Sequence, residues 1–436
     1  MTFLADIIEI NAQQTASAIV FDRDSDNQHL IHSFSPTTSA IQIFNHLSAA
    51  VLPQATQEQR AINLHGPYGS GKSHLAVVLA QLLRDGSGAE GFSGLFERIK
   101  NFSSAKLADD LRNTFLPADD KDAKPYLLVS LYGSECTSIP DKLMEGLCEA
   151  LKRHPDLNLE NILPKTEYDV CVSCFKDMIA NTPDFANADL PMDLAQDYLT
   201  TSDMLRGLEH HEPRALLVFK DWYRHSVHGR TFNPSNEGGK NFIEAFVEAG
   251  KNLAEQHHFG GIVVIWDEFG FALEDLISNS QRNAQQEIKA LESFVQTACS
   301  PTTGHTIFIG LTHVSFPEYA SRTGANETIA NNLKQITGRF KTFKVELNAA
   351  ESEGYHLLGM QRSWTERGKQ LLALAVIVKQ ALLENCRQLA LFNQLGTHLD
   401  DVLLDVYPLH PIMAAGLFAL SGEVAHGFLI KQETNI

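Results

Sequence analysis

An eight-residue glycine-rich segment constrains the fold of this chain more than any other feature. It consists of Gly66, Pro67, Tyr68, Gly69, Ser70, Gly71, Lys72 and Ser73. Two glycines five positions apart, followed by Lys and Ser or Thr, form the nucleotide-binding P-loop pattern. The glycines allow successive backbone N–H groups to point into one concavity that accepts phosphate oxygens. In this pattern Lys72 contacts the β- and γ-phosphates, and the Ser73 hydroxyl binds Mg²⁺.

The residues on both sides of this segment match the context that the pattern requires. Residues 61–65 form a short strand-like run before it. Apolar residues with helical spacing predict a helix from Lys72 to about Leu83, whose positive dipole end faces the same anion. We therefore expect residues 66–74, with His74 included, to bind ATP. The alternative is a glycine-rich turn in which Lys72 and Ser73 occur by chance.

A second segment, residues 260–269, predicts the catalytic side of the same site. Five consecutive apolar residues, 262–266, favour a strand that is covered on both faces. Asp267 and Glu268 follow it, at the edge where open α/β sheets bind their ligands. We expect Asp267 to hold Mg²⁺ through water and Glu268 to polarise the attacking water. Acidic turns after strands are common, so this interpretation depends on the P-loop pattern; Glu268 then favours an ATP-hydrolysing machine over a small-molecule kinase.

A third apolar strand is predicted over residues 305–313, after a helix at about 284–298. A polar side chain at its end could sit between the two phosphate strands and orient water. Thr312 is the first candidate and His313 the second. The alternative is that Thr312 merely ends a strand.

The segment 331–347 completes the predicted unit. A helix is expected to end at Gly338, and a strand with Phe343, Val345 and Leu347 on one face is expected to follow Arg339. In this order the segments resemble the motifs of AAA+ ATPases and their STAND-type relatives. They correspond to Walker A at 66–73, Walker B at 267–268, sensor 1 at 312 and the arginine-finger box before the last strand.

The resemblance covers about residues 56–348. It implies a homo-oligomer in which Arg339 reaches the γ-phosphate bound by a neighbouring subunit, where a planar guanidinium stabilises the transition state. The alternative is a surface arginine that pairs locally.

The C-terminal part carries a finer resemblance. Residues 407–412, with the sequence Tyr-Pro-Leu-His-Pro-Ile, are similar to a signature of large bacterial ATPases from anti-phage defence islands, including BREX-type systems. The resemblance implies partner proteins of a defence system. Those ATPases continue for many hundreds of residues beyond the signature, whereas this chain ends at Ile436. We therefore expect a truncated member or a separately encoded ATPase subunit.

The motifs divide the chain of 436 residues into parts. Residues 1–55 form a leading segment, and 56–348 form the ATPase core, with a second core strand at 125–131. Residues 155–240 are expected to form a helical insertion, and 349–436 a helical lid-like region. The predicted fold class is a P-loop NTPase, an α/β protein with a three-layer α/β/α core, a parallel sheet, the helical insertion and a C-terminal helical lid.

Composition favours a cytoplasmic protein with no membrane partner. No apolar run reaches the roughly 18 residues of a membrane span, and the first ten residues lack the basic region of a secretory signal. Six scattered cysteines predict reduced thiols, and for Cys171 and Cys174 we favour free thiols over a metal site. Since the net charge is −18, DNA would bind only indirectly or through a local basic patch. The best local concentration is Lys334, Arg339, Lys341 and Lys344.

These expectations together predict Mg-dependent ATP hydrolysis that drives conformational change in a multi-protein assembly, of the phage-defence or DNA-processing kind. The alternative is an ATP-bound switch or scaffold with little turnover. A small-molecule kinase is a third reading, which Glu268 and the helical C-terminal part weaken.

Overall fold

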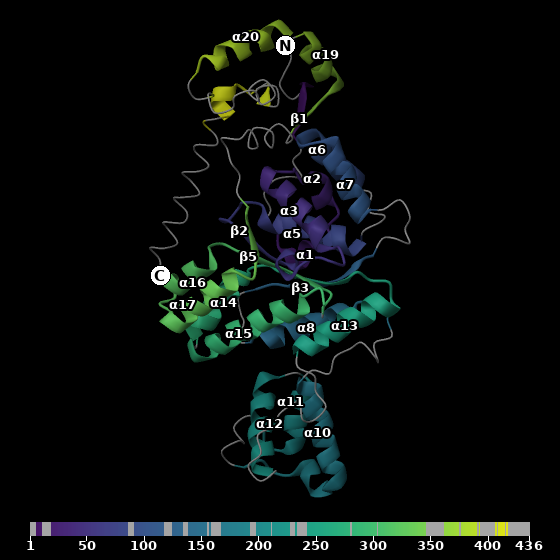
Figure 1. The fold of residues 1–436 in the computed structure, drawn as a ribbon, viewed down its shortest axis with the longest axis vertical. Coiled ribbons are helices and arrows are strands. Elements are labelled where there is room, and N and C mark those ends of the chain that lie inside the picture. The colour runs from purple at the N-terminus through teal and green to yellow at the C-terminus, as the bar shows by residue number, and fades with distance from the viewer. Residues whose placement is uncertain are drawn as a thin grey trace.

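The structure is a computed structural model built around one parallel β-sheet (Figure 1). It describes residues 6–10, 19–85, 91–116, 124–133, 138–154, 157, 167–191, 198–210, 212–226, 232, 242–279, 281–302, 304–345, 362–374, 376–389, 392, 406–407, 409–414 and 416. Helices cover both faces of the sheet, so the core is a three-layer α/β/α arrangement.

The sheet has five strands in the order β3-β4-β5-β2-β6. They are β2 (Ala61–His65), β3 (Tyr126–Leu131), β4 (Gly261–Trp266), β5 (Thr306–Thr312) and β6 (Lys341–Lys344). Each neighbouring pair is parallel. The order places β5 between β2 and β4, as expected for the strand that follows the acidic segment. All five carboxyl ends therefore lie along the same edge of the sheet.

Two groups of helices form the outer layers. One face carries α1 (Phe21–Asp24), α2 (His29–Ser33), α3 (Thr38–Ala50), α5 (Lys72–Asp85), α6 (Gly91–Phe102) and α7 (Ala105–Phe115). The other face carries α8 (Ile139–Lys152), α13 (Phe242–Gln256), α14 (Phe269–Asn279), α15 (Gln281–Ala298), α16 (Phe316–Arg322) and α17 (Glu327–Thr337). A short helix, α4 (Gln57–Arg60), leads directly into β2.

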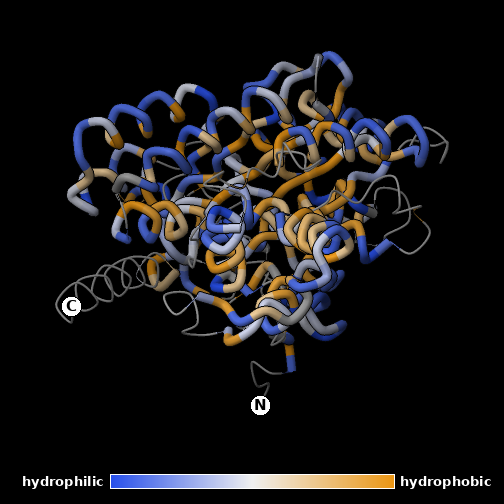
Figure 2. Tube along the Cα trace, turned by 90° about the horizontal axis from the view of Figure 1, so that it is seen from below, coloured by the Kyte–Doolittle hydropathy of each residue, from blue (hydrophilic) through white to orange (hydrophobic). Residues whose placement is uncertain are grey.

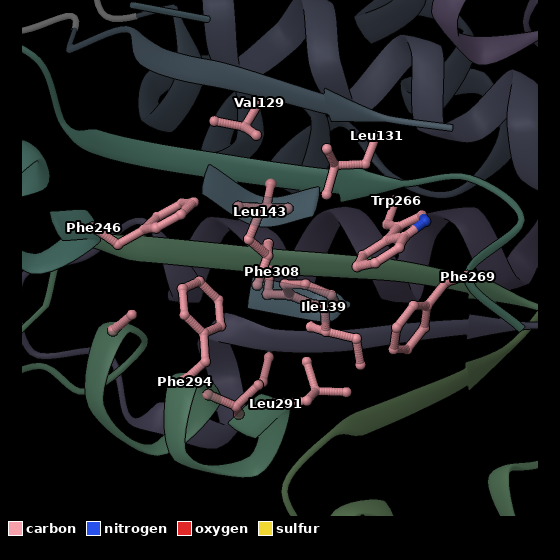
Figure 3. Close-up of a cluster of buried hydrophobic side chains, with 14 of the residues drawn as sticks. Val129, Leu131, Ile139, Leu143, Phe246, Trp266, Phe269, Leu291, Phe294 and Phe308 are labelled. Atoms are coloured by element: carbon pink, nitrogen blue, oxygen red, sulfur yellow. The ribbon is translucent and has the colours of Figure 1, made fainter. Parts of the chain in front are cut away.

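The strand side chains alternate between two hydrophobic cores because successive residues of a strand point to opposite faces. On β4, Ile262, Val264 and Trp266 join the core beneath α8 and α13–α17, whereas Val263 and Ile265 join the core on the other face. Figure 3 shows Trp266 and Phe308 of neighbouring strands packed against Phe269 and Phe294 of the helices. Every residue of β4 and β5 is buried, which is why their sequences read as continuous apolar runs.

Local capping explains where several helices begin. The Thr37, Ser138 and Asn326 side chains each accept a backbone N–H at the start of α3, α8 and α17. At the end of α17, Gly338 has φ −70°, a right-handed conformation. The helix ends at Gly338, as predicted.

A helical module projects from the helical layer formed by α8 and α13 (Figure 1). It comprises α10 (Glu167–Asn181), the short 3-10 helix η3 (Pro183–Asn187), α11 (Thr201–Glu209) and α12 (Pro213–Ser226). Its buried residues form a hydrophobic core of their own, centred on Phe175, Phe219 and Trp222. Between α12 and α13 the structure describes Phe232, which packs on this core. Seen from below, hydrophobic segments lie mainly towards the middle of the described chain and hydrophilic ones mainly at its periphery (Figure 2).

The sequence did not predict a second, two-stranded sheet between the beginning of the chain and its C-terminal region. β1 (Ile8–Ile10) pairs antiparallel with β7 (Arg362–Trp364), and Thr365 Oγ1 donates to the Asp6 carbonyl oxygen over 2.8 Å. Two helices follow within the region that was expected to be helical, α19 (Glu366–Leu374) and α20 (Val376–Arg387). The Tyr407 ring stacks on Trp364 at 6.1 Å. Of the predicted strand beyond β6, Val345 is buried, whereas Leu347 lies outside the described residues.

Candidate functional site

The predicted phosphate-binding residues meet at the carboxyl edge of the sheet. The glycine-rich loop (Gly66–Ser73) follows β2, the acidic pair Asp267 and Glu268 follows β4, and His313 follows β5. Since β5 lies between β2 and β4, these three connections are neighbours in space.

The loop has the backbone shape that its glycines predict. Gly69 and Gly71 have φ angles of +74° and +88°, a region that residues other than glycine rarely occupy. The α5 helix begins at Lys72, so its amino-terminal end faces the loop. The Ser70 hydroxyl is buried and has no hydrogen-bond partner among the described residues. A buried polar oxygen without a partner in a loop of this shape is consistent with a site for a polar ligand.

The Lys72 ammonium group is almost fully buried and contacts the loop itself. Its Nζ atom donates to the carbonyl oxygens of Gly66 (2.5 Å) and Pro67 (2.8 Å), and lies 3.5 Å from Nδ1 of His313. Burial lowers the pKa of Lys72 to about 8, although the nearby charges of Glu268 and Asp267 act in the opposite direction. The lysine is therefore a buried cation beside the loop, held by contacts that an incoming phosphate could replace.

Ser73, in the first turn of α5, faces Asp267, which directly follows β4. Ser73 Oγ donates to Asp267 Oδ1 over 3.4 Å, and the same carboxylate oxygen accepts the Glu268 N–H over 3.0 Å. Burial raises the pKa of Asp267, and the charge of Glu268 raises it further. A hydroxyl and a buried carboxylate are the hard oxygen donors that Mg²⁺ prefers, together with water and phosphate. This pair therefore fits the predicted Mg²⁺ site.

Glu268 adopts a left-handed backbone conformation with φ +62°, which is uncommon for a residue with a side chain. This conformation turns the chain from β4 into α14 and leaves the carboxylate beside β5. There Glu268 Oε2 lies 2.8 Å from Nε2 of His313. The predicted general base is thus already engaged by a neighbouring side chain.

The two candidates at the end of β5 have different surroundings. Thr312 is fully buried, and its hydroxyl donates to Oδ1 of Asn63 on β2 over 3.0 Å. His313 is the residue whose side chain contacts both Lys72 and Glu268. The polar Asn63 inside an otherwise apolar strand was a signal for a buried partner that the sequence analysis did not use.

Aromatic rings surround His313. The Tyr68 ring stacks on the His313 ring at a centroid distance of 3.8 Å, and Phe271 lies 5.1 Å from His313. The Tyr319 hydroxyl accepts the backbone N–H of His313 over 3.0 Å. Tyr319 was not predicted to take part, because nothing in the sequence of α16 marks one tyrosine as facing the site.

Two other predicted residues lie apart from this cluster. His74 Nε2 lies 2.7 Å from the Leu30 carbonyl oxygen, so its ring contacts α2. Arg339 precedes β6, and since Lys341 pairs with Ile62 in the parallel register, Arg339 lies at the amino edge of the sheet. Its Nε atom is 3.4 Å from Glu292 Oε1, and its carbonyl oxygen accepts from Gln57 Nε2 over 2.7 Å. The structure therefore does not bring Arg339 to the loop of its own chain.

The remaining sequence expectations concern thiols and membranes. Cys171 and Cys174 are buried on α10 and form no disulfide among the described residues, and Cys136 lies outside those residues. In the described part of the chain, no three side chains of His, Cys, Asp or Glu are grouped to hold a metal ion. None of the described helices is both long and apolar enough to span a bilayer.

Comparison with known proteins identified no relative. No protein-family model matches the sequence, no curated protein is significantly similar to it, and no solved structure matches its fold significantly.

Proposed function

We propose that this chain is a P-loop NTPase that binds ATP and hydrolyses it with Mg²⁺. One observation carries the proposal: the buried Lys72 and the Ser73 hydroxyl begin a helix beside Asp267 and Glu268, which follow β4. A cation, a hydroxyl–carboxylate pair and a second carboxylate are the groups that phosphoryl transfer to water requires.

The loop would bind the phosphates. Positive potential for the β-phosphate would come from the backbone N–H groups around Gly69 and Gly71 and from the amino-terminal end of α5. Lys72 would exchange the Gly66 and Pro67 carbonyl oxygens for phosphate oxygens, which carry full negative charge and bind an ammonium more strongly. Ser73 and Asp267 would hold Mg²⁺, which when bound supplies charge neutralisation at the phosphates.

Glu268 would then act on water. The oxygen of a water molecule bonds to the γ-phosphorus, the bond from this phosphorus to the β-phosphate oxygen breaks, and ADP leaves with the electron pair. The Glu268 carboxylate accepts a proton of that water, and inorganic phosphate forms. His313 and Glu268 lie on adjacent strand ends, so both are close to where the γ-phosphate would lie.

We further propose an assembly of the AAA+ kind, with subunits that share sites. The motif order and the position of β5 between β2 and β4 support this proposal. Arg339 is half-exposed at the far edge of its own sheet, where it can face another subunit. Residues 407–412 support partners from a bacterial defence system. A contact with DNA would use the exposed Lys334, Lys341 and Lys344 beside Arg339, since the chain as a whole is acidic.

The second candidate is an ATP-bound switch with little turnover. The distance of Arg339 from the loop of the same chain favours it, because a lone subunit would lack this arginine at its phosphates. Steady-state phosphate release from purified protein, with and without DNA and across protein concentrations, distinguishes the two. Turnover that rises with protein concentration supports the assembled ATPase. Stoichiometric ATP binding with no turnover at any concentration supports the switch, and no ATP binding at all contradicts both.

A further inference from the structure

The Glu268 carboxylate is the end of a chain of contacts that begins in the glycine-rich loop. Tyr68 belongs to that loop and stacks on His313 with an interplanar angle of 22°. His313 in turn contacts Glu268 Oε2 over 2.8 Å. The side chains of His313 and Glu268 are largely buried, with 13% and 26% of their surfaces exposed. Loop and carboxylate are therefore connected through one imidazole ring.

The contacts of this ring determine which nitrogen carries its proton. Nδ1 lies 3.5 Å from the Lys72 ammonium, which has hydrogen-bond donors only, so Nδ1 must accept. The proton of the neutral imidazole then resides on Nε2, and Nε2–H donates to Glu268. In this tautomer the ring fixes the Glu268 carboxylate without neutralising it, and one carboxylate oxygen stays available as a base.

The backbone that carries the His313 ring is also fixed in place. The Tyr319 hydroxyl accepts the backbone N–H groups of His313 (3.0 Å) and Val314 (3.4 Å). Tyr319 itself fits over Gly270, where a Cβ atom would lie 1.8 Å from the Tyr319 hydroxyl oxygen. The backbone of His313 is thus anchored, and the stack on Tyr68 adds to the contacts with Glu268 and Lys72 that limit rotation of its ring. Tyr68 exposes 52% of its surface, so burial of its own ring does not explain a large aromatic residue at this position.

We propose that Tyr68 and His313 are positioning residues for Glu268, so that the phosphate-binding loop itself orients the carboxylate that activates water. This inference rests on the proposed ATPase function. The backbone of residue 68 belongs to the predicted ATP-binding loop, but the Tyr68 ring stacks on His313. Losing the ring therefore lowers the rate of hydrolysis, and the loop backbone that would bind the nucleotide keeps its affinity unchanged.

The first test compares Tyr68→Leu with Tyr132→Leu, the same replacement at a tyrosine with 43% exposure that follows β3. We expect kcat to fall roughly 10- to 100-fold in Tyr68→Leu, as for a misplaced catalytic group, and to stay unchanged in Tyr132→Leu. The Kd of a non-hydrolysable ATP analogue should change less than about 2-fold in both. Tyr68→Phe retains the ring and should recover most of the lost kcat. Equal kcat in the two leucine variants, or a parallel loss of affinity and kcat in Tyr68→Leu, overturns the proposal.

A second measurement does not depend on turnover. Nitrogen-15 NMR of histidine-labelled protein reports the tautomer of His313, and the signal is assigned by its loss in His313→Gln. We expect a neutral ring protonated on Nε2 in wild-type protein and a mixture of tautomers in Tyr68→Leu. Identical tautomer populations in the two proteins contradict the role of Tyr68. A wild-type protein without hydrolysis but with the expected tautomer contradicts the ATPase proposal alone.

Discussion

Gly66 and Val345 lie so close that a Cβ atom on residue 66 would come within 2.0 Å of the Val345 carbonyl oxygen. The Val345 N–H also donates to the His65 carbonyl oxygen over 2.7 Å, so the chain leaving β6 is joined to the chain entering the loop. Residue 66 therefore needs to lack a side chain in order to accommodate the chain that follows β6, independently of any ligand in the loop.

This contact predicts that Gly66→Ala displaces the chain after β6 and distorts the loop. We expect a loss of about 1–3 kcal/mol in the free energy of unfolding, together with weakened ATP binding. Gly94→Ala is the control, since that glycine lies inside α6 and a Cβ there meets only Nη1 of the Arg98 side chain, at 3.3 Å. Urea unfolding monitored by circular dichroism measures the stability of both variants, and titration calorimetry measures their ATP binding. Equal stability of Gly66→Ala and Gly94→Ala would show that the loop yields without cost.

Lys72→Ala should abolish tight ATP binding and leave the fold intact. The substitution removes the charged side chain at the first position of α5, next to the glycine-rich loop. Hydrogen bonds to charged groups contribute about 1.5–3 kcal/mol each. We expect affinity to fall at least roughly 10-fold, measured by titration calorimetry. Lys251→Ala, on the exposed face of α13, is the matched control. Wild-type affinity in Lys72→Ala would exclude the loop as the phosphate site.

Glu268→Gln should bind ATP and fail to hydrolyse it. The amide retains the shape of the side chain and a partner for His313 Nε2, but it cannot accept a proton from water. We expect kcat to fall roughly 10²- to 10⁴-fold with little change in Kd. Glu255→Gln, an exposed carboxylate on α13, controls for loss of charge. Hydrolysis at the wild-type rate in Glu268→Gln would mean that another group is the base.

Arg339→Ala tests the shared site. This variant should bind ATP nearly normally and lose turnover, because the proposed contact forms only between subunits. Mixing it with Glu268→Gln should restore partial activity wherever an intact Glu268 meets an intact Arg339 of a neighbour. As a control, Glu292→Gln removes the local partner of Arg339. Adding this substitution to the Glu268→Gln protein should leave the activity of the mixture unchanged. A protein that sediments as a monomer with ATP, and a mixture that remains inactive, would leave Arg339 as a locally paired surface residue.

Acidification should destabilise the protein through half-buried histidines. Burial lowers the pKa of His46 and of His74, whose ring nitrogens contact the carbonyl oxygens of Gln59 and Leu30. A histidine whose pKa falls on folding keeps its full contribution above the unfolded value of about 6.5. Below that value the unfolded chain binds more protons, so stability decreases. Urea midpoints should fall between pH 7.5 and pH 5.5, and fall less in the double variant His46→Gln, His74→Gln. The same pH dependence in both proteins would assign the effect to other groups.

The sheet and its edge of functional residues were largely predictable because the signals are local. β2, β4 and α5 lie where the apolar runs and the helical spacing predicted them. The choice between Thr312 and His313 was not predictable, since a shift of one residue moves a strand side chain to the opposite face. Only the folded structure shows that Thr312, which pairs with His65 in the register of β5 with β2, is enclosed and donates its hydroxyl to Asn63. The Glu292 partner of Arg339 comes from a helix 47 residues earlier in sequence and left no local trace.

The pairing of β1 with β7 has a consequence for synthesis of the chain. The strand partners Ile10 and Arg362 are separated by about 350 residues, so β1 leaves the ribosome long before its partner exists. At typical elongation rates the interval is about 20 to 70 seconds, during which a strand with two isoleucines has an open edge. The sheet core can fold in that time because all of its strands lie between the two partners. Pairing of β1 with β7 is then a late step. It can occur only after the chain from the glycine-rich loop to β6 has been synthesised.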